Sequence, residues 1–198
     1  MAVKTDRRIR KTKAQLRAGL AKLMQDKSIK EITVKELVDV VDINRSTFYL
    51  HYTDIYNMLD EIEKELLAEI IHAIDTHPIG FNENTFPFIA DMFSILADNK
   101  DICTALMGPN GDSTFIYKIE EIIEENSMKA LTQYFPGSIE DLKYSYAFCL
   151  TGCVGLIKIW LNSNGSESPE HMAQLTYQMV LNSMTVFADA KKNGVHLY

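Results

Sequence analysis

The 198-residue sequence has few of the features that mark secreted and membrane proteins. Its three cysteines, Cys103, Cys149 and Cys153, cannot all pair within one chain, and no secretory signal precedes them. The longest uncharged apolar run, residues 146–157, contains 12 residues, whereas a bilayer-spanning helix needs about 20. We therefore expect a cytoplasmic protein with reduced cysteines and no membrane segment.

Motifs of the common enzyme classes are also missing. The sequence contains no Gly-rich phosphate loop, no HExxH and no GxSxG. Glu69 and His72 have the Glu-x-x-His spacing of di-iron helix bundles, but such a site needs a second copy that this chain lacks. The glutamates between residues 120 and 125 fit the solvated side of a helix better than a metal or acid–base site. We expect no enzyme activity, no catalytic residue, no metal and no cofactor.

Charge is divided unevenly along the chain. Residues 1–53 contain 12 Lys and Arg against 6 Asp and Glu, a net charge of +6. Residues 54–198 contain 8 and 21, a net charge of −13, within a total of −7. A DNA-binding module needs such local basic charge, because neutralising phosphates supplies most non-specific affinity. The acidic remainder would be repelled from the duplex.

Residues 33–52 predict two short helices joined by a tight turn, the arrangement of a helix-turn-helix. Thr33 and Glu36 have the spacing of a capping box at the start of the first helix, and Asn44 is a favourable N-cap for the second. The apolar residues of the first helix recur at i, i+3, i+4 and i+7, namely Val34, Leu37, Val38 and Val41.

The second of these helices has an outward side suited to DNA. Phe48 and Tyr52, one turn apart, define its core side. The outward positions are then Ser46, Thr47, Tyr49 and Leu50, flanked by Arg45 and His51. Short, hydroxyl-bearing and aromatic groups can approach base edges and phosphates closely. The alternative is a surface helix of an ordinary helical bundle.

Residues 9–59 resemble the N-terminal domain of the TetR/AcrR family of bacterial transcription regulators. The resemblance is carried by the segment ITVKELVDVVDINRSTFYLHYTDIYNML, with its Ile-Thr-Val opening, its Thr-Phe-Tyr-Leu-His-Tyr end of the recognition helix and the long helix that follows. Two positions differ from the family pattern. Asp42 stands where the family usually has Gly, and Ile55 stands where it often has a Lys that contacts phosphate.

The resemblance, together with the outward side of the second helix, implies a set of DNA contacts. We expect base-edge or adjacent contacts from Arg45, Ser46 and Tyr49, and phosphate contacts from Lys35, Thr47 and His51. The basic residues between Lys4 and Lys13 are either a solvated terminus or an arm that lies on the DNA.

Helical periodicity continues to the end of the chain and predicts an all-α fold. The first expected helix ends near residue 26. The later ones cover about 34–41, 45–52, 54–77, 85–99, 100–107, 115–135, 138–162 and 169 onward. We predict an N-terminal three-helix domain with a helix-turn-helix, residues 1–53, and a C-terminal helical ligand-sensing and dimerisation domain, residues 54–198. The helix 54–77 is the expected connector.

The helix 138–162 is apolar nearly all round between Tyr146 and Leu161, so it must be covered on all sides. Gly152 and Gly155 indicate that another backbone approaches it closely. Resemblance to the family implies that the last two helices pair with their twins in a homodimer; the alternative is a purely internal core. The expected dimer residues are Val154, Ile157, Leu161, Met179 and Met184.

These features lead to the hypothesis of a ligand-released repressor that binds a palindromic double-stranded operator as a homodimer. Its effector would be a small apolar or aromatic molecule sensed by residues 54–198. One alternative is a DNA-bound adaptor of the same fold whose C-terminal domain binds a protein, as an activator partner or a division inhibitor would. Another is a helical protein that does not bind DNA, in which the helix-turn-helix is coincidental.

Overall fold

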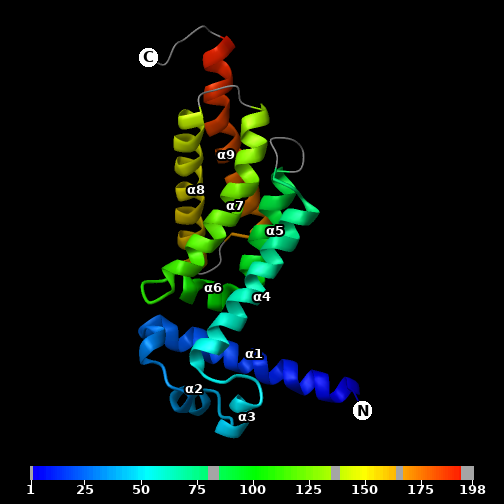
Figure 1. Cartoon of the computed structure of the whole chain (residues 1–198), viewed down its shortest axis with the longest axis vertical. Helices are drawn as coiled ribbons and strands as arrows, with labels where there is room; N and C mark the ends of the chain where they lie inside the picture. The colour runs from blue at the N-terminus through cyan, green and yellow to red at the C-terminus, as the bar shows by residue number, and fades with distance from the viewer. Residues whose placement is uncertain (1, 80–84, 135–138, 164–166, 193–198) are drawn as a thin grey trace. The chain divides into compact units, whose positions relative to one another are not determined.

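The computed structural model describes residues 2–79, 85–134, 139–163 and 167–192, without the side chains of 2–6, 85, 129, 133, 134, 139, 141 and 184–192. Throughout these ranges the secondary structure is helical, without a strand, so the predicted all-α fold is confirmed (Figure 1). The elements are α1 (Ala2–Asp26), the 3₁₀ turn η1 (Ile29–Glu31), α2 (Val34–Val40), α3 (Arg45–Tyr49), α4 (Ile55–Thr76), α5 (Thr85–Asp98), α6 (Lys100–Leu106), α7 (Ser113–Tyr134), α8 (Ile139–Asn162) and α9 (Pro169–Lys192).

The chain forms two compact units, and the functional boundary expected at residue 53 stays a prediction. The first unit contains residues 1–68 and 99–116, and the second contains 69–98 and 117–198. The first half of α4 belongs to the first unit because its apolar side, including Met58, Ile62 and Leu66, is buried there. Helix α6 belongs to it because α6 packs against α1.

The start of the helix-turn-helix follows local capping chemistry. The Thr33 hydroxyl accepts a hydrogen bond from the Glu36 backbone N–H at 3.2 Å, which confirms Thr33 as the N-cap of α2. The Glu36 carboxylate pairs with the Lys27 ammonium group instead of completing the capping box. Asn44 occupies the N-cap position of α3, but its side chain makes no capping hydrogen bond.

Two backbone features let α1, α2 and α3 meet. Asp42 has a φ of 53°, so it adopts the left-handed conformation that the turn requires even though Gly is absent. A Cβ atom at Gly19 would lie 2.3 Å from Val41 Cγ1 and 3.0 Å from Leu37 Cδ1. Glycine at residue 19 therefore allows α1 to approach the end of α2 closely.

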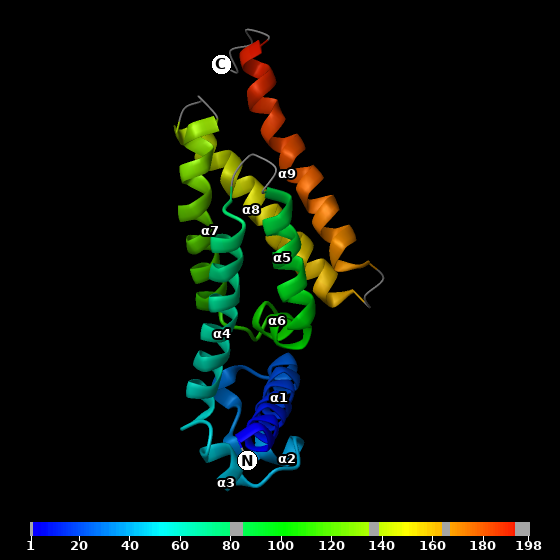
Figure 2. The ribbon, with the colours of Figure 1, turned by 90° about the vertical axis from the view of Figure 1, so that its right-hand side faces the viewer.

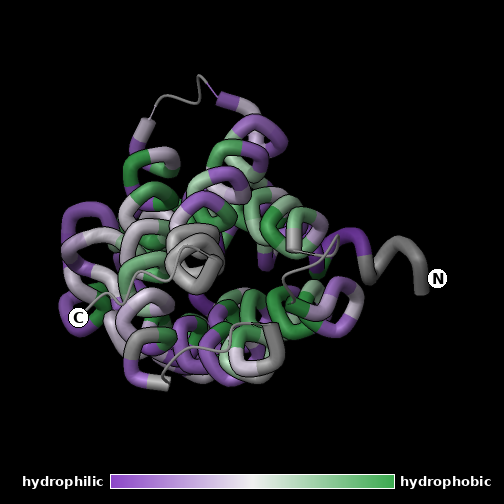
Figure 3. Tube along the Cα trace, turned by 90° about the horizontal axis from the view of Figure 1, so that it is seen from above, coloured by the Kyte–Doolittle hydropathy of each residue, from purple (hydrophilic) through white to green (hydrophobic). Residues whose placement is uncertain are grey.

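The second unit is a packed group of long helices. Helices α5 and α8 both pack against α9, and Figure 2 shows them running beside it. The Phe93 and Trp160 rings meet edge to face with their centroids 5.2 Å apart. Hydrophilic and hydrophobic stretches alternate along the helices, as amphipathic packing requires (Figure 3).

Helix α8 is uncovered on one side. Tyr144, Phe148 and Ile159 are about three-quarters exposed, and a Cβ atom at Gly152 or Gly155 would meet nothing within 4 Å. Within the described residues, the 21-residue stretch Leu142–Asn162 is also the helix that is long and apolar enough to cross a membrane. This stretch is longer than the uncharged run of residues 146–157 because it includes Lys143 and Lys158.

Candidate nucleic-acid interface

Helix α3 is held in place by its core side. Phe48 has no exposed surface and Tyr52 is 5% exposed, which confirms both as core residues. Their ring centroids lie 5.7 Å apart. Helix α3 itself is five residues long, shorter than the expected two turns, because the chain turns at Leu50 and His51. Its short outward side is thus fixed by two buried rings.

Arg45 and Tyr49 form a pair on the outward side of α3. The Arg45 Nε–H and an Nη2–H both donate to the Tyr49 hydroxyl oxygen, at 3.3 and 3.0 Å. The guanidinium carbon lies 5.5 Å from the centroid of the Tyr49 ring. Both residues are exposed, so the pair faces solvent at the first and last positions of the recognition helix.

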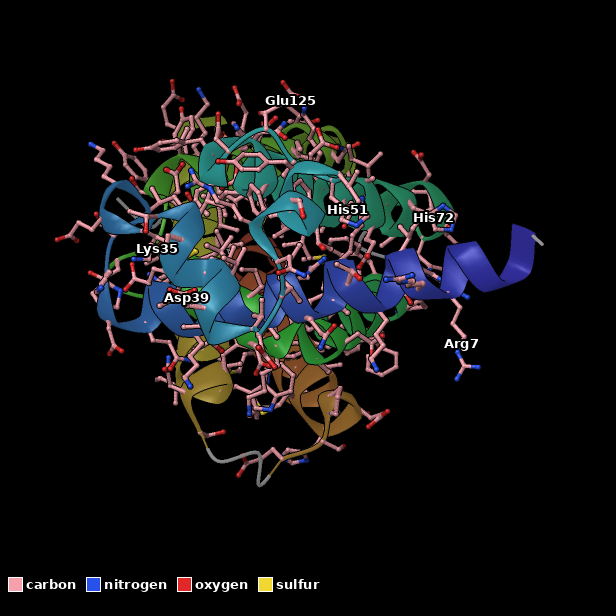
Figure 4. The ribbon with its side chains drawn as sticks, turned by 90° about the horizontal axis from the view of Figure 1, so that it is seen from below. Arg7, Lys35, Asp39, His51, His72 and Glu125 are labelled. Carbon is pink, nitrogen blue, oxygen red and sulfur yellow. The ribbon has the colours of Figure 1, made fainter. Side chains whose placement is uncertain are left out.

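The other predicted contact residues lie on the same short segment or on α2. Ser46 and Lys35 are exposed, and Thr47 and His51 are half-buried. The His51 ring lies beside the Tyr52 ring, with the centroids 6.3 Å apart. Figure 4 shows Lys35 on α2 and His51 just after α3. The structure thus gathers all six predicted residues on the helix-turn-helix, whereas their contacts with DNA stay a prediction.

The position where the family often has a phosphate-binding Lys is part of the core here. Ile55 is 4% exposed, while the next residue, Tyr56, is 55% exposed in the first turn of α4. Tyr56 was not among the predicted contact residues; at about 100° per residue it lies at the edge of the apolar side that Ile55 and Leu59 define.

The cations of the first unit fall into two groups. Arg17 is structural: it donates to Asn99 Oδ1 at 2.6 Å and to Glu65 Oε2 at 3.4 Å, which joins α1 to α4 and to the start of α6. Lys13 lies 3.8 Å from Glu65 and over the Tyr52 ring. By contrast, Lys35 forms no ion pair among the described side chains.

Near the N-terminus of α1, Arg7, Arg8 and Lys11 are exposed, and the Arg7 side chain extends away from the helix (Figure 4). The side chain of Lys4 lies outside the described residues. The exposed cations are available to neutralise phosphates.

The Tyr52 hydroxyl is uncharged at neutral pH. Burial, followed by the negative charge of Glu65, raises the pKa of Tyr52 to about 12. The Tyr52 ring therefore stays neutral in the core beside Phe48.

The predicted dimer residues are not equally accessible. Met179 is 53% exposed, and Val154 and Ile157 are half-buried. Leu161 is only 2% exposed within its own unit, so its side chain has little surface to offer a partner. The side chain of Met184 lies outside the described residues. The more exposed stripe of Tyr144, Phe148 and Ile159 was missed; its spacing along one face of α8 could have indicated it.

The described residues contain no cluster of three His, Cys, Asp or Glu that could hold a metal ion. No disulfide links Cys103, Cys149 and Cys153. Burial, followed by the proximity of Cys149, raises the pKa of Cys153 to about 11, so its thiol stays protonated and unreactive. The Cys149 thiol and the Ser183 hydroxyl form a hydrogen bond between α8 and α9, with Sγ and Oγ 2.9 Å apart.

Solved structures of regulators share this fold. The TetR transcriptional regulator from Streptococcus agalactiae 2603V matches with a TM-score of 0.56 and 22% identity over 91% of this chain and 99% of its own. The dihydroxyacetone kinase operon activator DhaS matches with a TM-score of 0.60 and 14% identity over 89% and 97%. The fatty acid degradation regulator FadR from Bacillus halodurans matches with a TM-score of 0.62 and 10% identity over 85% and 94%.

Sequence comparisons agree. A curated relative, the uncharacterized HTH-type transcriptional regulator YxbF of Bacillus subtilis (strain 168), is 21% identical over 175 residues, which are 84% of this chain. The chain spans 44% of the length of that relative. Residues 83–182, half of the chain, match the TetR family model described as transcriptional regulator C-terminal region. The chain therefore belongs to the TetR family of transcriptional regulators.

Proposed function

We propose that this protein is a cytoplasmic, DNA-binding repressor that binds a palindromic operator as a homodimer and is released by a small effector. One observation carries the DNA-binding part of the proposal: α3 presents Arg45, Ser46 and Tyr49 outward from a base of buried rings. Recognition helices of helix-turn-helix proteins lie in the major groove with their N-terminal residues on base edges. Arg45 is the first residue of α3.

The phosphate contacts would come from residues at the edges of the outward side of α3. Lys35 on α2 and His51 after α3 lie on either side of the recognition helix in sequence, and Thr47 is half-buried on α3 itself. Arg7 and its basic neighbours on α1 add charge along the backbone. Such contacts fix the orientation of the protein, whereas base contacts select the sequence.

The uncovered side of α8 supports the homodimer. Its exposed residues follow a spacing of 4, 4, 3 and 4 along one face, namely Tyr144, Phe148, Gly152, Gly155 and Ile159. A partner backbone can come close at the two glycines while the large side chains bury apolar area. The remaining faces of α8 include side chains buried within the unit, so we assign this helix to a protein contact and not to a bilayer.

A two-fold dimer presents two recognition helices related by the same symmetry. The matching DNA site is therefore palindromic, with half-sites one helical turn or a small multiple apart.

The second unit would sense the effector. Phe88, Phe93 and Trp160 are buried there, an interior that suits an apolar or aromatic molecule. Because α4 contributes to both units, a movement of α4 would transmit binding to the recognition helix. The alternative is an adaptor whose C-terminal domain binds a protein, such as an activator partner. It is kept because the structural neighbour DhaS is an operon activator, so proteins of this fold are not limited to repression.

The proposal is tested by titrating purified protein into the DNA upstream of its own gene and into a scrambled duplex of equal length. We expect tighter binding to the upstream DNA, and an affinity that falls steeply as salt rises, because bound phosphates release counterions. Weak binding that is equal on both duplexes would contradict it.

A further inference from the structure

We infer that Tyr49 holds Arg45 in a fixed orientation so that the free edge of the guanidinium group reads one guanine in each operator half-site. Arg45 would be the specificity-determining residue and Tyr49 a positioning residue. The inference rests on the proposed function and adds the identity of a base and the way in which it is recognised.

The orientation of Arg45 follows from two hydrogen bonds to one oxygen. Its Nε–H and one Nη2–H converge on the Tyr49 hydroxyl at 3.3 and 3.0 Å, across the i, i+4 spacing of one helical turn. The guanidinium carbon is also 5.5 Å from the Tyr49 ring centroid. These contacts restrict the rotation of a side chain that is otherwise flexible.

Tyr49 is itself anchored to the core. Its ring meets the Phe48 ring edge to face, with centroids 5.4 Å apart and an interplanar angle of 86°. Phe48 has no exposed surface. The chain of contacts therefore runs from the core through Tyr49 to Arg45, and the guanidinium group is oriented before any DNA is bound.

The donors that remain on Arg45 match guanine. A guanidinium group has five N–H donors, and the tyrosine uses one on Nε and one on Nη2. The two hydrogens of Nη1 and the second of Nη2 stay free, and one from each nitrogen points along the same outer edge. Two parallel donors need two neighbouring acceptors, and in the major groove guanine offers them as O6 and N7, whereas adenine, cytosine and thymine each offer fewer.

The charge of Arg45 is not cancelled within the described part of the chain, where none of its contacts is with a carboxylate. A phosphate could accept the same two donors. Because Arg45 is the first residue of the recognition helix, we assign it to a base. The phosphate contact is the competing outcome of the test.

The test selects binding sites from a pool of random duplexes with four proteins: wild type, Arg45→Lys, Tyr49→Phe and the control Tyr117→Phe. Tyr117 is an exposed tyrosine of α7 in the second unit, so its variant removes the same hydroxyl group elsewhere. We expect an invariant guanine in each half-site for wild type and control. In Arg45→Lys and Tyr49→Phe the preference for that guanine should fall by about tenfold or more, as expected for loss of a bidentate contact.

A second measurement uses the site selected by the wild type, with that guanine replaced by 7-deazaguanine, which lacks the N7 acceptor. Wild-type affinity should fall about tenfold, while Tyr49→Phe, which has already lost the oriented contact, should change much less. Equal affinity of the wild type for both duplexes would overturn the inference.

The outcomes separate this inference from the proposed function. Selection of a palindrome without an invariant guanine, or full retention of the guanine in Tyr49→Phe, would overturn the inference and leave the proposed function standing. A uniform loss of affinity with unchanged base preference would assign Arg45 to a phosphate and also overturn it. Failure of the wild type to select any site would overturn both.

Discussion

At the residue scale, the positions toward the core were predictable and the contacts between exposed side chains were not. Phe48 and Tyr52 are buried, as their i, i+4 spacing predicted. Spacing also places Arg45 and Tyr49 one turn apart. Spacing does not reveal that the Nε–H and an Nη2–H of Arg45 both donate to the Tyr49 hydroxyl, because these contacts depend on side-chain rotamers that the sequence leaves open.

Phe48 should be the main anchor of the recognition helix. Replacing it by Ala removes a side chain with no exposed surface, so the free energy of unfolding should fall by about 3–5 kcal/mol. Leu50→Ala is the matched control, because Leu50 is 79% exposed and its loss should change stability by less than about 0.5 kcal/mol. Denaturant unfolding followed by circular dichroism measures both. Equal destabilisation by the two changes would contradict the assignment of Phe48 to the core.

At the element scale, helix limits followed the sequence closely where a cap marks them. Helices α2, α4 and α9 begin after Thr33, Asp54 and Ser168, whose side chains each accept a hydrogen bond from a backbone N–H three residues on. The expected start of α8 at Ser138 lies outside the described residues. The length of α3 was overestimated because no residue type marks the turn after Tyr49.

The cap of α4 gives a prediction for this long helix. The Asp54 carboxylate accepts from the Asn57 N–H at 2.8 Å, and Asn57 Oδ1 accepts from the Thr53 N–H at 3.1 Å. Asp54→Ala should lower the free energy of unfolding by about 1 kcal/mol, and Asp54→Ser should restore most of it. The measurement is thermal unfolding of the three proteins side by side. An Asp54→Ser variant as unstable as Asp54→Ala would show that the carboxylate matters for another reason.

At the scale of the whole molecule, the sequence predicted two functional parts but not how the compact units divide. Residues 99–116 join the first unit although they lie far along the chain, because α6 packs on α1 and Arg17 bonds to Asn99. Local periodicity identifies a helix but cannot name its partner. The sequence likewise predicted that α8 needs cover from a partner, but not which of its sides is uncovered.

The homodimer can be tested on that side of α8. Phe148 is 74% exposed, so Phe148→Glu should leave the fold of the protomer intact while placing a charge in the proposed contact. Sedimentation velocity should then show monomers at concentrations where the wild type is dimeric. Tyr117→Glu, a similar change at a 65% exposed residue of α7, should remain dimeric. A Phe148→Glu protein that sediments as the wild type does would remove α8 from the interface.

The central claim is that the outward side of α3 selects the DNA sequence, and the most direct measurement is the effect of Tyr49→Ala on specific and non-specific DNA affinity at one salt concentration. Tyr49 is 47% exposed, so its removal should leave thermal unfolding nearly unchanged. We predict that affinity for the selected DNA falls by about 1–3 kcal/mol while affinity for scrambled DNA is retained. Undiminished selectivity in Tyr49→Ala would contradict the claim.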